Sequence, residues 1–384
     1  MHRLYFWLTA YLFIVLFVLN FSLIGENHHV YLANSFLKGI TSLVEVPQRI
    51  WDLSYFQGRY YLPFGPLPTV ILMPFVWLFK LNFQESIIKF PITILNFWLV
   101  LKICRKLNLQ TEKAMLVAVF FIFGSIYTPV AIIPYSSYLA QVFATSMLLL
   151  AIYEFLSGKR WLAVGTAVAL ATLTRLNLAL GVLFFILNLV KKPINFIGGV
   201  KLILPIIIVL SLLALYNYQR FNTAFESGYR YQLIPEESKA RKDQGLISLK
   251  HVPANLYYML IKTPNPVMEN NSHVFKFPFL KFDPYGMSIF FLSPVLFLIF
   301  RAKLSDRLVK TSLITVSLIL ITLILYYGIG WRQVGYRYAL DFLPFLLIPL
   351  VSAIQKVSIK TIAILTIAGI IITWFFTIEM ILGY

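Results

Sequence analysis

Apolar residues in this chain occur in runs of about 16 to 21 residues, separated by short polar segments, along the whole sequence. A helix needs about 20 largely apolar residues to cross a hydrocarbon core about 30 Å thick. Because lipid offers the backbone no hydrogen bonds, only helices and closed barrels can span it. The pattern therefore predicts an all-α polytopic membrane protein that forms a single domain over residues 1–384. No small-residue cleavage site follows the first run, residues 4–24, so we expect an anchor that stays in the membrane.

Composition agrees with a lipid environment. Of the 384 residues, 59% are hydrophobic and 12% are charged, with a mean hydropathy of +0.80. A net charge of +18 can indicate nucleic-acid or membrane-surface binding. Most of the basic residues flank apolar runs, however, which is typical of a topology signal, and we expect no nucleic-acid partner. The single cysteine, Cys104, excludes an internal disulfide.

The basic residues also orient the predicted spans, because short cytoplasmic loops carry an excess of Lys and Arg. With Arg3 inside, residues 86–103 must be the second span, so that the basic cluster from Lys102 to Lys113 also lies inside. Residues 64–82 contain three prolines and are predicted to form an interfacial or partly inserted helix on the outer face. The full prediction has about eleven transmembrane helices, at 4–24, 86–103, 114–131, 138–157, two arms within 161–190, 199–217, 286–300, 311–328, 339–354 and 361–380.

This topology leaves two long outer loops, at 25–85 and 218–285, which we expect to form a polar cap. Within the first, the segment HHVYLANSFLKG at 28–39 spaces its apolar residues as one stripe, which predicts an amphipathic helix lying in the interface. The hairpin within 161–190 has basic residues at both ends, the second being Lys191 and Lys192. Arg175 is therefore expected near its outer tip.

Side chains with useful chemistry are concentrated in these predicted outer segments. Ionisable groups at or near membrane depth are costly and point to function. The candidates for catalysis or substrate binding are Glu26, His28, Asp52, Arg59, Tyr60, Tyr61, Arg175, Tyr229, Arg230, Arg332 and Arg337.

The acidic candidates suit the role of a general base. Glu26 directly follows the first span, and Asp52 precedes a Tyr-rich segment. A carboxylate near an apolar wall can remove a proton from an acceptor hydroxyl while a new bond forms. Each acid also has a non-catalytic interpretation. Asp52 could cap a helix or form an ion pair with Arg49 or Arg59, and Glu26 could simply be solvated at the membrane interface.

Two adjacent histidines, His28 and His29, raise the question of a metal site. Neighbouring side chains on a helix point about 100° apart, and no further ligand stands at a suitable spacing. We therefore expect no cofactor, although a divalent metal stays an open alternative.

The arginine candidates suit phosphate groups, because a guanidinium fork binds phosphate oxygens in a bidentate manner. Arg175, Arg332 and Arg337 lie near the predicted outer lipid boundary, where a lipid phosphate would be found. Arg337 equally suits a structural ion pair with Asp341, four positions further on. The sequence lacks GxSxG, P-loop, HExxH and dinucleotide fingerprints, which disfavours a nucleotide-driven pump or a soluble-type hydrolase.

Four segments carry a resemblance to a known superfamily. They are DLSYFQGRYYLPFGPLPTVILMPF, AVGTAVALATLTRLNLAL, LYNYQRFNTAFESGYRY and GYRYALDFLPFLLIPL, which follow an acidic first outer loop. In this order they resemble the bacterial multi-spanning glycosyltransferases of the C type, which include protein mannosyltransferases and aminoarabinose transferases. The similarity covers nearly the whole chain in the order of its elements.

The resemblance implies transfer of a hexosyl or pentosyl group from a polyprenyl-phosphate donor to a glycan, lipid or protein acceptor. It also implies a bacterial inner membrane location, an extracytoplasmic site and a role in the cell envelope. In that family an acidic residue just after the first span acts as the base. The matching stretch here reads GENHHVYLA and departs from the usual Asp-containing pattern, so Glu26, His28 and Asp52 all stay open for the role. The resemblance assigns the lipid-phosphate contact to Arg175 and, less directly, to Arg337.

A transporter or flippase of a lipid-linked saccharide is the alternative. Such a protein often has charged or broken helices near the midplane and two related halves. This chain instead gathers its polar residues on one predicted side of the membrane.

Overall fold

The computed structural model describes residues 2–190, 195–269 and 273–383, with side chains from Trp7 onward. The chain is mostly helical, with two short two-stranded ribbons. It divides into two compact units. Unit 1 comprises Met1–Leu12, Val100–Val130 and Ile247–Tyr384, and unit 2 comprises Phe13–Leu99 and Ala131–Leu246. Three helices run through the boundaries between these segments: α1 (His2–Ser22), α4 (Ser86–Lys106) and α6 (Tyr127–Ile132).

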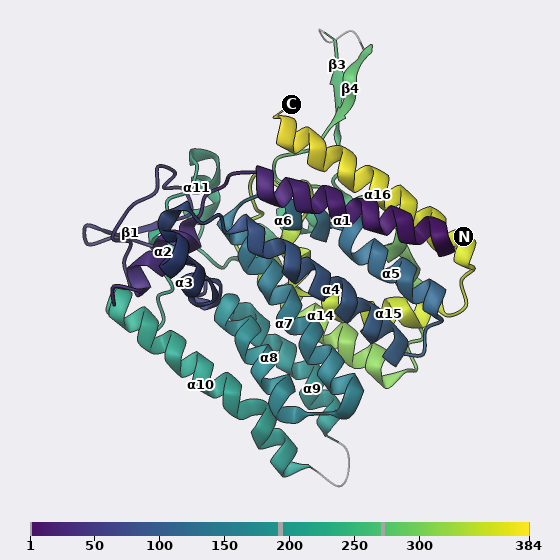
Figure 1. Ribbon diagram of the computed structural model, residues 1–384, viewed down its shortest axis with the longest axis horizontal. Coiled ribbons are helices and arrows are strands. Elements are labelled where there is room, and N and C mark those ends of the chain that lie inside the picture. Colours follow the sequence, from purple (N-terminus) through teal and green to yellow (C-terminus); the bar gives the residue numbers. More distant parts are fainter. Residues whose placement is uncertain (1, 191–194, 270–272, 384) are drawn as a thin grey trace. The chain divides into compact units, whose positions relative to one another are not determined.

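Unit 2 is built on three helices that lie side by side. α8 (Trp161–Thr174) packs against both α7 (Ser136–Gly158) and α10 (Phe196–Phe221) (Figure 1). The other elements of this unit are α2 (His28–Phe36), β1 (Ser54–Phe56), β2 (Arg59–Tyr61), α3 (Leu67–Phe79), η1 (Lys80–Asn82), η2 (Leu176–Gly181), α9 (Val182–Leu189), η3 (Tyr229–Tyr231) and α11 (Glu236–Lys242).

Unit 1 pairs α14 (Arg307–Leu325) with α15 (Leu343–Ile354), and α5 (Thr111–Phe123) with α16 (Ile359–Leu382). Gly124 allows the second pair a close approach, because a Cβ there would lie 3.2 Å from the Thr366 carbonyl oxygen. The remaining elements are η4 (Leu249–His251), α12 (Val252–Leu256), the π-helical turn η5 (Tyr257–Ile261), β3 (Asn265–Met268), β4 (Phe275–Lys281), α13 (Ile289–Leu292), η6 (Pro294–Arg301) and η7 (Arg337–Asp341).

Among the described residues, five helices are long and apolar enough to cross a membrane: α4, α7, α10, α14 and α16. The exposed surface of α10 indicates which solvent such a helix requires. Only 22% of its most apolar stretch is buried inside the protein, against 78% for α7. An apolar surface of this size is not stable in water, and a hydrocarbon environment accounts for it.

Several predicted spans are shorter or interrupted in the structure. The apolar run at 114–131 is divided between α5 and α6, because α5 ends at Phe123 and Gly124 follows it. The run at 286–300 is not one α-helix: α13 ends at Leu292, and after Ser293 the 3₁₀-helix η6 begins at Pro294. A proline has no N–H and cannot continue the preceding helix.

Other predicted elements are present. A helix of nine residues, α2, begins at His28, and the predicted interfacial segment at 64–82 contains α3 and η1. Arg175 lies between α8 and η2, at the junction of the predicted 161–190 hairpin. Lys191 and Lys192, the predicted inner end of that hairpin, lie outside the described residues.

Candidate functional site

The candidate site begins where the chain leaves α1 and passes close to the start of α7. Gly25 makes this approach possible, because a Cβ there would lie 1.8 Å from the carbonyl oxygen of Pro134. The next amide, from Glu26, donates to the same oxygen at 3.2 Å. Asn27 then takes a left-handed conformation, with φ of 54°, and α2 starts at His28. This geometry fixes the direction of the Glu26 side chain.

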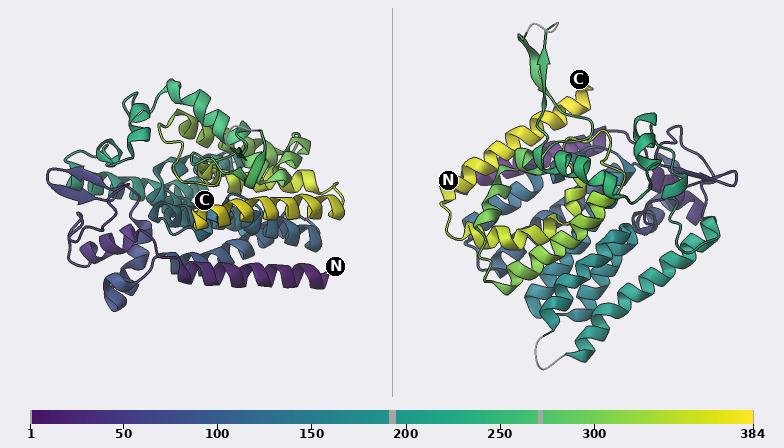
Figure 2. Two further views of the ribbon diagram at one scale, coloured as in Figure 1. Left: turned by 90° about the horizontal axis from the view of Figure 1, so that it is seen from above. Right: turned by 180° about the vertical axis from the view of Figure 1, so that it is seen from behind.

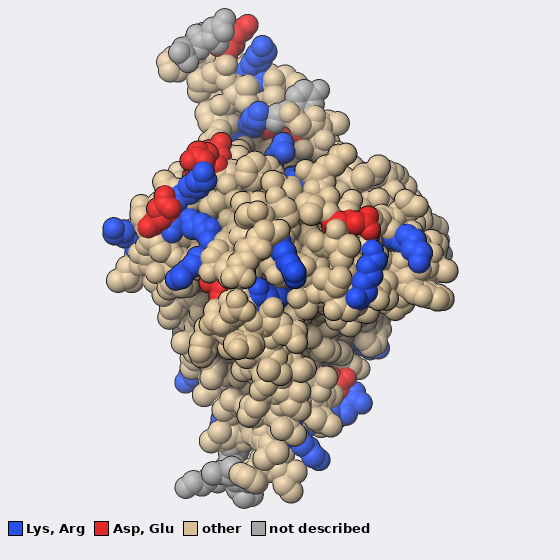
Figure 3. Space-filling view, turned by 90° about the vertical axis from the view of Figure 1, so that its left-hand side faces the viewer, with Lys and Arg blue, Asp and Glu red and all other residues tan. Residues whose placement is uncertain are grey.

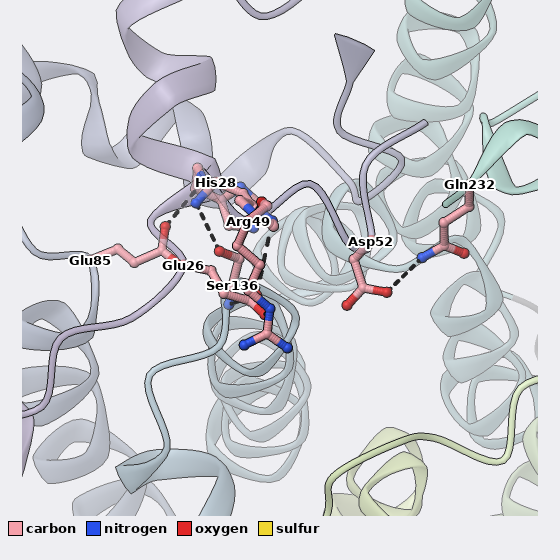
Figure 4. A network of polar contacts seen from close by, with 8 residues as sticks. Glu26, His28, Arg49, Asp52, Glu85, Ser136 and Gln232 are labelled. Atoms are coloured by element: carbon pink, nitrogen blue, oxygen red, sulfur yellow. Dashed lines mark hydrogen bonds and ion pairs between the residues drawn. The ribbon is translucent and has the colours of Figure 1, made fainter. Parts of the chain in front are cut away.

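Glu26 is a buried carboxylate held by several groups (Figure 4). One oxygen lies 3.2 Å from Nε of Arg49, and the other accepts a hydrogen bond of 3.2 Å from the backbone N–H of Ser136. Nδ1 of His28 lies 3.9 Å from the same carboxylate. The Arg49 guanidinium also lies 5.0 Å from the ring centre of Tyr135. Held in this way by Arg49 and Ser136, Glu26 fixes the loop that follows α1.

The two adjacent histidines point to different partners. Nε2 of His28 donates to the carbonyl oxygen of Arg49 at 2.9 Å, whereas Nδ1 of His29 lies 2.8 Å from the Thr69 hydroxyl. Burial lowers the pKa of His28, and burial lowers the pKa of His29 to about 3. Both rings are therefore expected to be neutral at pH 7. In the described part of the chain, no three His, Cys, Asp or Glu side chains are grouped as metal ligands would be.

Glu85 extends this polar cluster at the start of α4. One carboxylate oxygen accepts from the backbone N–H of His29 at 3.1 Å, and its own N–H donates to the Asn27 side chain at 3.1 Å. Burial raises the pKa of Glu85 to about 7, and the nearby charge of Glu26 acts in the same direction. One turn further on, the buried Nζ of Lys89 donates to the carbonyl oxygen of Ile133.

Asp52 has a different environment from Glu26. It is only half-buried, and its backbone takes the left-handed conformation with φ of 70°. Its N–H donates to the Leu233 carbonyl oxygen at 2.9 Å, and its Oδ1 accepts a hydrogen bond of 3.0 Å from the side-chain amide of Gln232 (Figure 4). Asp52 is also near enough to His28 to raise the pKa of that ring. Besides the buried carboxylates of Glu26 and Glu85, the site thus has a more accessible one, Asp52, held in an uncommon backbone conformation.

The β1–β2 ribbon places the three residues Arg59, Tyr60 and Tyr61 differently. Arg59 is exposed, and Tyr60 is half-buried with its ring 5.0 Å from that of Tyr55. Tyr61 is buried, and its ring lies 5.2 Å from Phe221. Arg59 and Tyr60 therefore have surface available to a substrate, whereas Tyr61 packs in the interior.

Arg175 is joined to this region through a close backbone contact. It is half-buried and extended, with φ of −147° and ψ of 113°. A Cβ on Gly65 would lie 2.2 Å from the Leu173 carbonyl oxygen and 2.5 Å from that of Thr174. Only glycine allows the 62–66 loop to pack this tightly beside the residue that precedes Arg175.

The segment after α10 completes the region. Tyr229 is half-buried in η3, while Arg230 is exposed with Nε 4.0 Å from the Glu226 carboxylate. The buried Arg220 donates to the Leu62 carbonyl oxygen at 2.8 Å and so ties the end of α10 to the first outer loop. The Ser54 hydroxyl makes a second tie, at 2.8 Å, to the Gly228 carbonyl oxygen.

Two of the arginine candidates belong to unit 1. Arg332 is exposed and has a φ of 49°. Arg337 is buried in η7, the same 3₁₀-helix that contains Asp341, and its guanidinium lies 4.6 Å from the Tyr338 ring centre. Burial leaves Arg337 little surface for a ligand.

We found no protein-family model, no curated protein and no solved structure that matches this chain.

The sequence alone did not indicate several residues of the site. Ser136 and Gln232 lie 110 and 180 positions from the carboxylates they contact. Both are common polar residues in unremarkable sequence surroundings, so no local signal could have identified them. Arg49 was considered as a partner of Asp52, and the structure places its Nε beside Glu26.

Proposed function

We propose that this chain is a multi-pass membrane glycosyltransferase of the C type. It transfers a sugar from a polyprenyl-phosphate donor to a glycan, lipid or protein acceptor at the outer face of the membrane. The observation that carries the proposal is the half-buried Asp52 carboxylate, oriented by Gln232 beside the Glu26, His28 and Arg49 cluster.

Contacts between segments that are predicted to lie outside support this topology. In unit 2, the first outer loop meets the start of α7 through Glu26 and Ser136, the 161–190 hairpin through Gly65, and the post-α10 segment through Leu62 and Arg220. On the face seen in Figure 3, Lys, Arg, Asp and Glu side chains are more numerous over the upper half than over the lower half. A single polar side is expected of a chain with about eleven crossings and its active site on the extracytoplasmic face of a bacterial inner membrane.

The predicted inner loops also meet one another, within unit 1. Nζ of Lys113 donates to the Gln355 carbonyl oxygen at 2.8 Å, and the Gln355 amide donates to that of Leu107 at 3.4 Å. The backbone N–H of Lys303 donates to the Ser352 hydroxyl at 3.3 Å. Loops assigned to one side by their charge are therefore neighbours in space, as the predicted threading requires.

The proposed reaction is a single displacement. The Asp52 carboxylate takes the proton of the acceptor hydroxyl while the acceptor oxygen attacks the anomeric carbon. The bond from that carbon to the phosphate oxygen breaks, and polyprenyl phosphate leaves with the bonding electron pair. Attack opposite the leaving group inverts the anomeric configuration. Since the leaving group is already a phosphate, it needs a cation more than a proton, and Arg175 is proposed to supply that charge.

Glu26 has a supporting role in this proposal. Its contacts with Arg49 and Ser136 fix the chain from Gly25 to His28 and hold Arg49 in place. His28 in turn contacts the Arg49 carbonyl oxygen, three positions before Asp52. The base is thus positioned from both sides, by this cluster and by Gln232.

A lipid-consumption assay tests the proposal directly. Proteoliposomes of the purified protein are incubated with the polyprenyl-phosphate sugars and envelope acceptors extracted from the native membrane, and the products are identified by mass spectrometry. With wild-type protein we expect one polyprenyl-phosphate sugar to be consumed and polyprenyl phosphate to appear. With the Asp52→Asn variant we expect little of that sugar donor to be consumed. Translocation of an unaltered lipid-linked saccharide across the vesicle membrane would instead support the transporter.

A further inference from the structure

The β3–β4 ribbon carries an aromatic surface that the proposed reaction does not use. The two strands are antiparallel, with Met268 opposite Phe275. Three phenylalanines of β4 are unusually accessible: Phe275 is 54% exposed, Phe277 is 70% exposed and Phe279 is 52% exposed. Exposed apolar groups concentrated on one short element are typical of a contact surface for another apolar phase.

The base of the ribbon is attached to the last turn of α16. The backbone N–H of Phe282, which follows β4, donates to the Glu379 carboxylate at 3.1 Å. Before β3, Nζ of Lys262 lies 3.4 Å from the Asp283 carboxylate, so both ends of the ribbon are held together. Glu379 is three residues from the end of α16 at Leu382, about 4.5 Å along the helix axis. The ribbon therefore starts close to the level at which this apolar helix ends.

The ribbon extends from that point away from the helices of unit 1. Figure 1 shows β3 and β4 beside the end of α16, and the right-hand view of Figure 2 shows them projecting freely from it. The seven residues of β4 reach about 23 Å. A segment of this length that starts at the end of a membrane-spanning helix has lipid within its reach.

The composition of β4 matches a lipid interface. Its sequence, FKFPFLK, combines the three phenylalanines with Lys276 and Lys281 and contains no acidic residue. Aromatic side chains favour the boundary between headgroups and acyl chains, and lysines near it are attracted to lipid phosphates. A soluble acidic partner would use the lysines but would leave the phenylalanines in water.

We propose that the β3–β4 ribbon is a membrane-docking element. Phe275, Phe277 and Phe279 insert into the lipid layer at the end of α16, and Lys276 and Lys281 contact the headgroup phosphates. The ribbon then fixes the tilt of α16 and of the segment 282–288 that follows it. This inference depends on the membrane placement of α16 and is independent of the transfer reaction.

Site-directed spin labelling tests the proposal. Cys104, the only cysteine, is replaced by alanine, and one nitroxide is attached at Phe277→Cys in protein reconstituted into phosphatidylcholine vesicles containing phosphatidylglycerol. We expect high accessibility to oxygen and low accessibility to a water-soluble nickel complex. The control label, at Lys239→Cys in the polar α11, is expected to show the reverse.

Two results would overturn the proposal. The first is equal aqueous accessibility at positions 277 and 239, which would place the ribbon in water. The second is protection at 277 together with spin–spin broadening that disappears on dilution with unlabelled protein, because that result would assign the surface to a second copy of the chain. Replacing Lys276 and Lys281 by glutamate should reduce the insertion depth in phosphatidylglycerol vesicles and change it less in pure phosphatidylcholine.

Discussion

The side-chain amide of Gln232 donates a 3.0 Å hydrogen bond to the carboxylate of Asp52, across 180 positions of sequence. The backbone makes the same connection, since the Asp52 N–H donates to the Leu233 carbonyl oxygen and the Leu233 N–H to that of Leu53. Two segments that are distant in sequence thus orient one half-buried carboxylate. This relationship identifies Asp52 as the proposed base in preference to Glu26, whose oxygens are already engaged.

The first prediction concerns this pair. Asp52→Asn should fold normally, because asparagine tolerates a positive φ and keeps an acceptor for Gln232. Transfer should fall by about 10²- to 10⁴-fold, the usual contribution of a general base. Gln232→Ala should reduce the rate less, by roughly 10- to 100-fold, since a hydrogen bond to a charged group contributes about 1.5–3 kcal/mol. The measurement is the initial rate in proteoliposomes.

Gln244→Ala is the matched control, because the Gln244 side chain is exposed at the end of α11. It should leave the rate unchanged. A Gln232→Ala protein with the wild-type rate would reject the orienting role, and full activity of Asp52→Asn would reject the base.

The second prediction concerns the buried carboxylate of Glu26 and its partner Arg49. Removing the cation with Arg49→Met leaves a buried charge without its ion pair, and should cost roughly 1–3 kcal/mol. Glu26→Gln should cost less, because the amide oxygen still accepts from the Ser136 N–H. The double variant should be less damaged than the sum of the two, since no unpaired charge then stays buried. The apparent Tm of each variant in detergent measures how strongly each change destabilises the protein.

The exposed pair of Lys38 and Glu45, at 3.5 Å, provides the comparison. Solvent screens such a pair, so Lys38→Met should change the apparent Tm very little. Strict additivity of the Glu26 and Arg49 variants would contradict the pairing.

The third prediction is a pH dependence that comes from Glu85 and His29. The pKa of Glu85 rises on folding from 4.5 to about 7, so folded protein binds more protons than unfolded protein between these values, and this contribution to stability falls as pH rises. The pKa of His29 falls from 6.5 to about 3, so its contribution rises with pH over that range. The two effects oppose each other between about pH 4.5 and 6.5.

Glu85→Gln separates the two contributions. The stability of this variant relative to wild type should increase as pH rises from 4.5 to 7, by on the order of 3 kcal/mol. Thermal unfolding in detergent at pH 5, 6, 7 and 8 measures the difference. A gap that does not change with pH would show that Glu85 is not buried as described.

How far the sequence predicts this structure depends on the range of the interactions. Apolar runs correctly predicted helices such as α7, α10 and α16, and the apolar stripe after His28 predicted the helix that begins there. The number of membrane crossings is harder to predict from the sequence. Helix interruptions such as the one at Ser293 and Pro294 depend on tertiary packing as well as on apolar content.

The arrangement of the candidate site depends on interactions of the same long range. The acids and arginines were visible because charged residues are rare in this chain. Which carboxylate is accessible was not visible, since Glu26 is engaged by Ser136 and Arg49, and Asp52 is oriented by Gln232. Such contacts form only when distant segments pack, and neutral polar partners leave no periodic or compositional signal.

The fourth prediction tests the packing of α8 on α10. A Cβ on Gly165 would lie 2.3 Å from the Leu202 carbonyl oxygen, so Gly165→Ala should push the two helices apart and cost about 1–3 kcal/mol. Gly199 lies on α10, and a Cβ there would lie 3.6 Å from the nearest atom, which is an ordinary contact. Gly199→Ala should be neutral or stabilise by up to about 1 kcal/mol through helix propensity. Equal apparent Tm values for the two variants would contradict the close contact.

The most direct test of the central claim is mass spectrometry of envelope glycolipids and glycans from a strain that lacks this protein, complemented with wild type or with Asp52→Asn at equal expression. We expect one sugar-bearing species to disappear in the deletion strain, while the polyprenyl-phosphate sugar that donates to it accumulates. The species should return only when the strain is complemented with wild type. Full restoration by Asp52→Asn, or an envelope profile that the deletion leaves unchanged, would contradict the proposal that this chain is a transferase with Asp52 as its base.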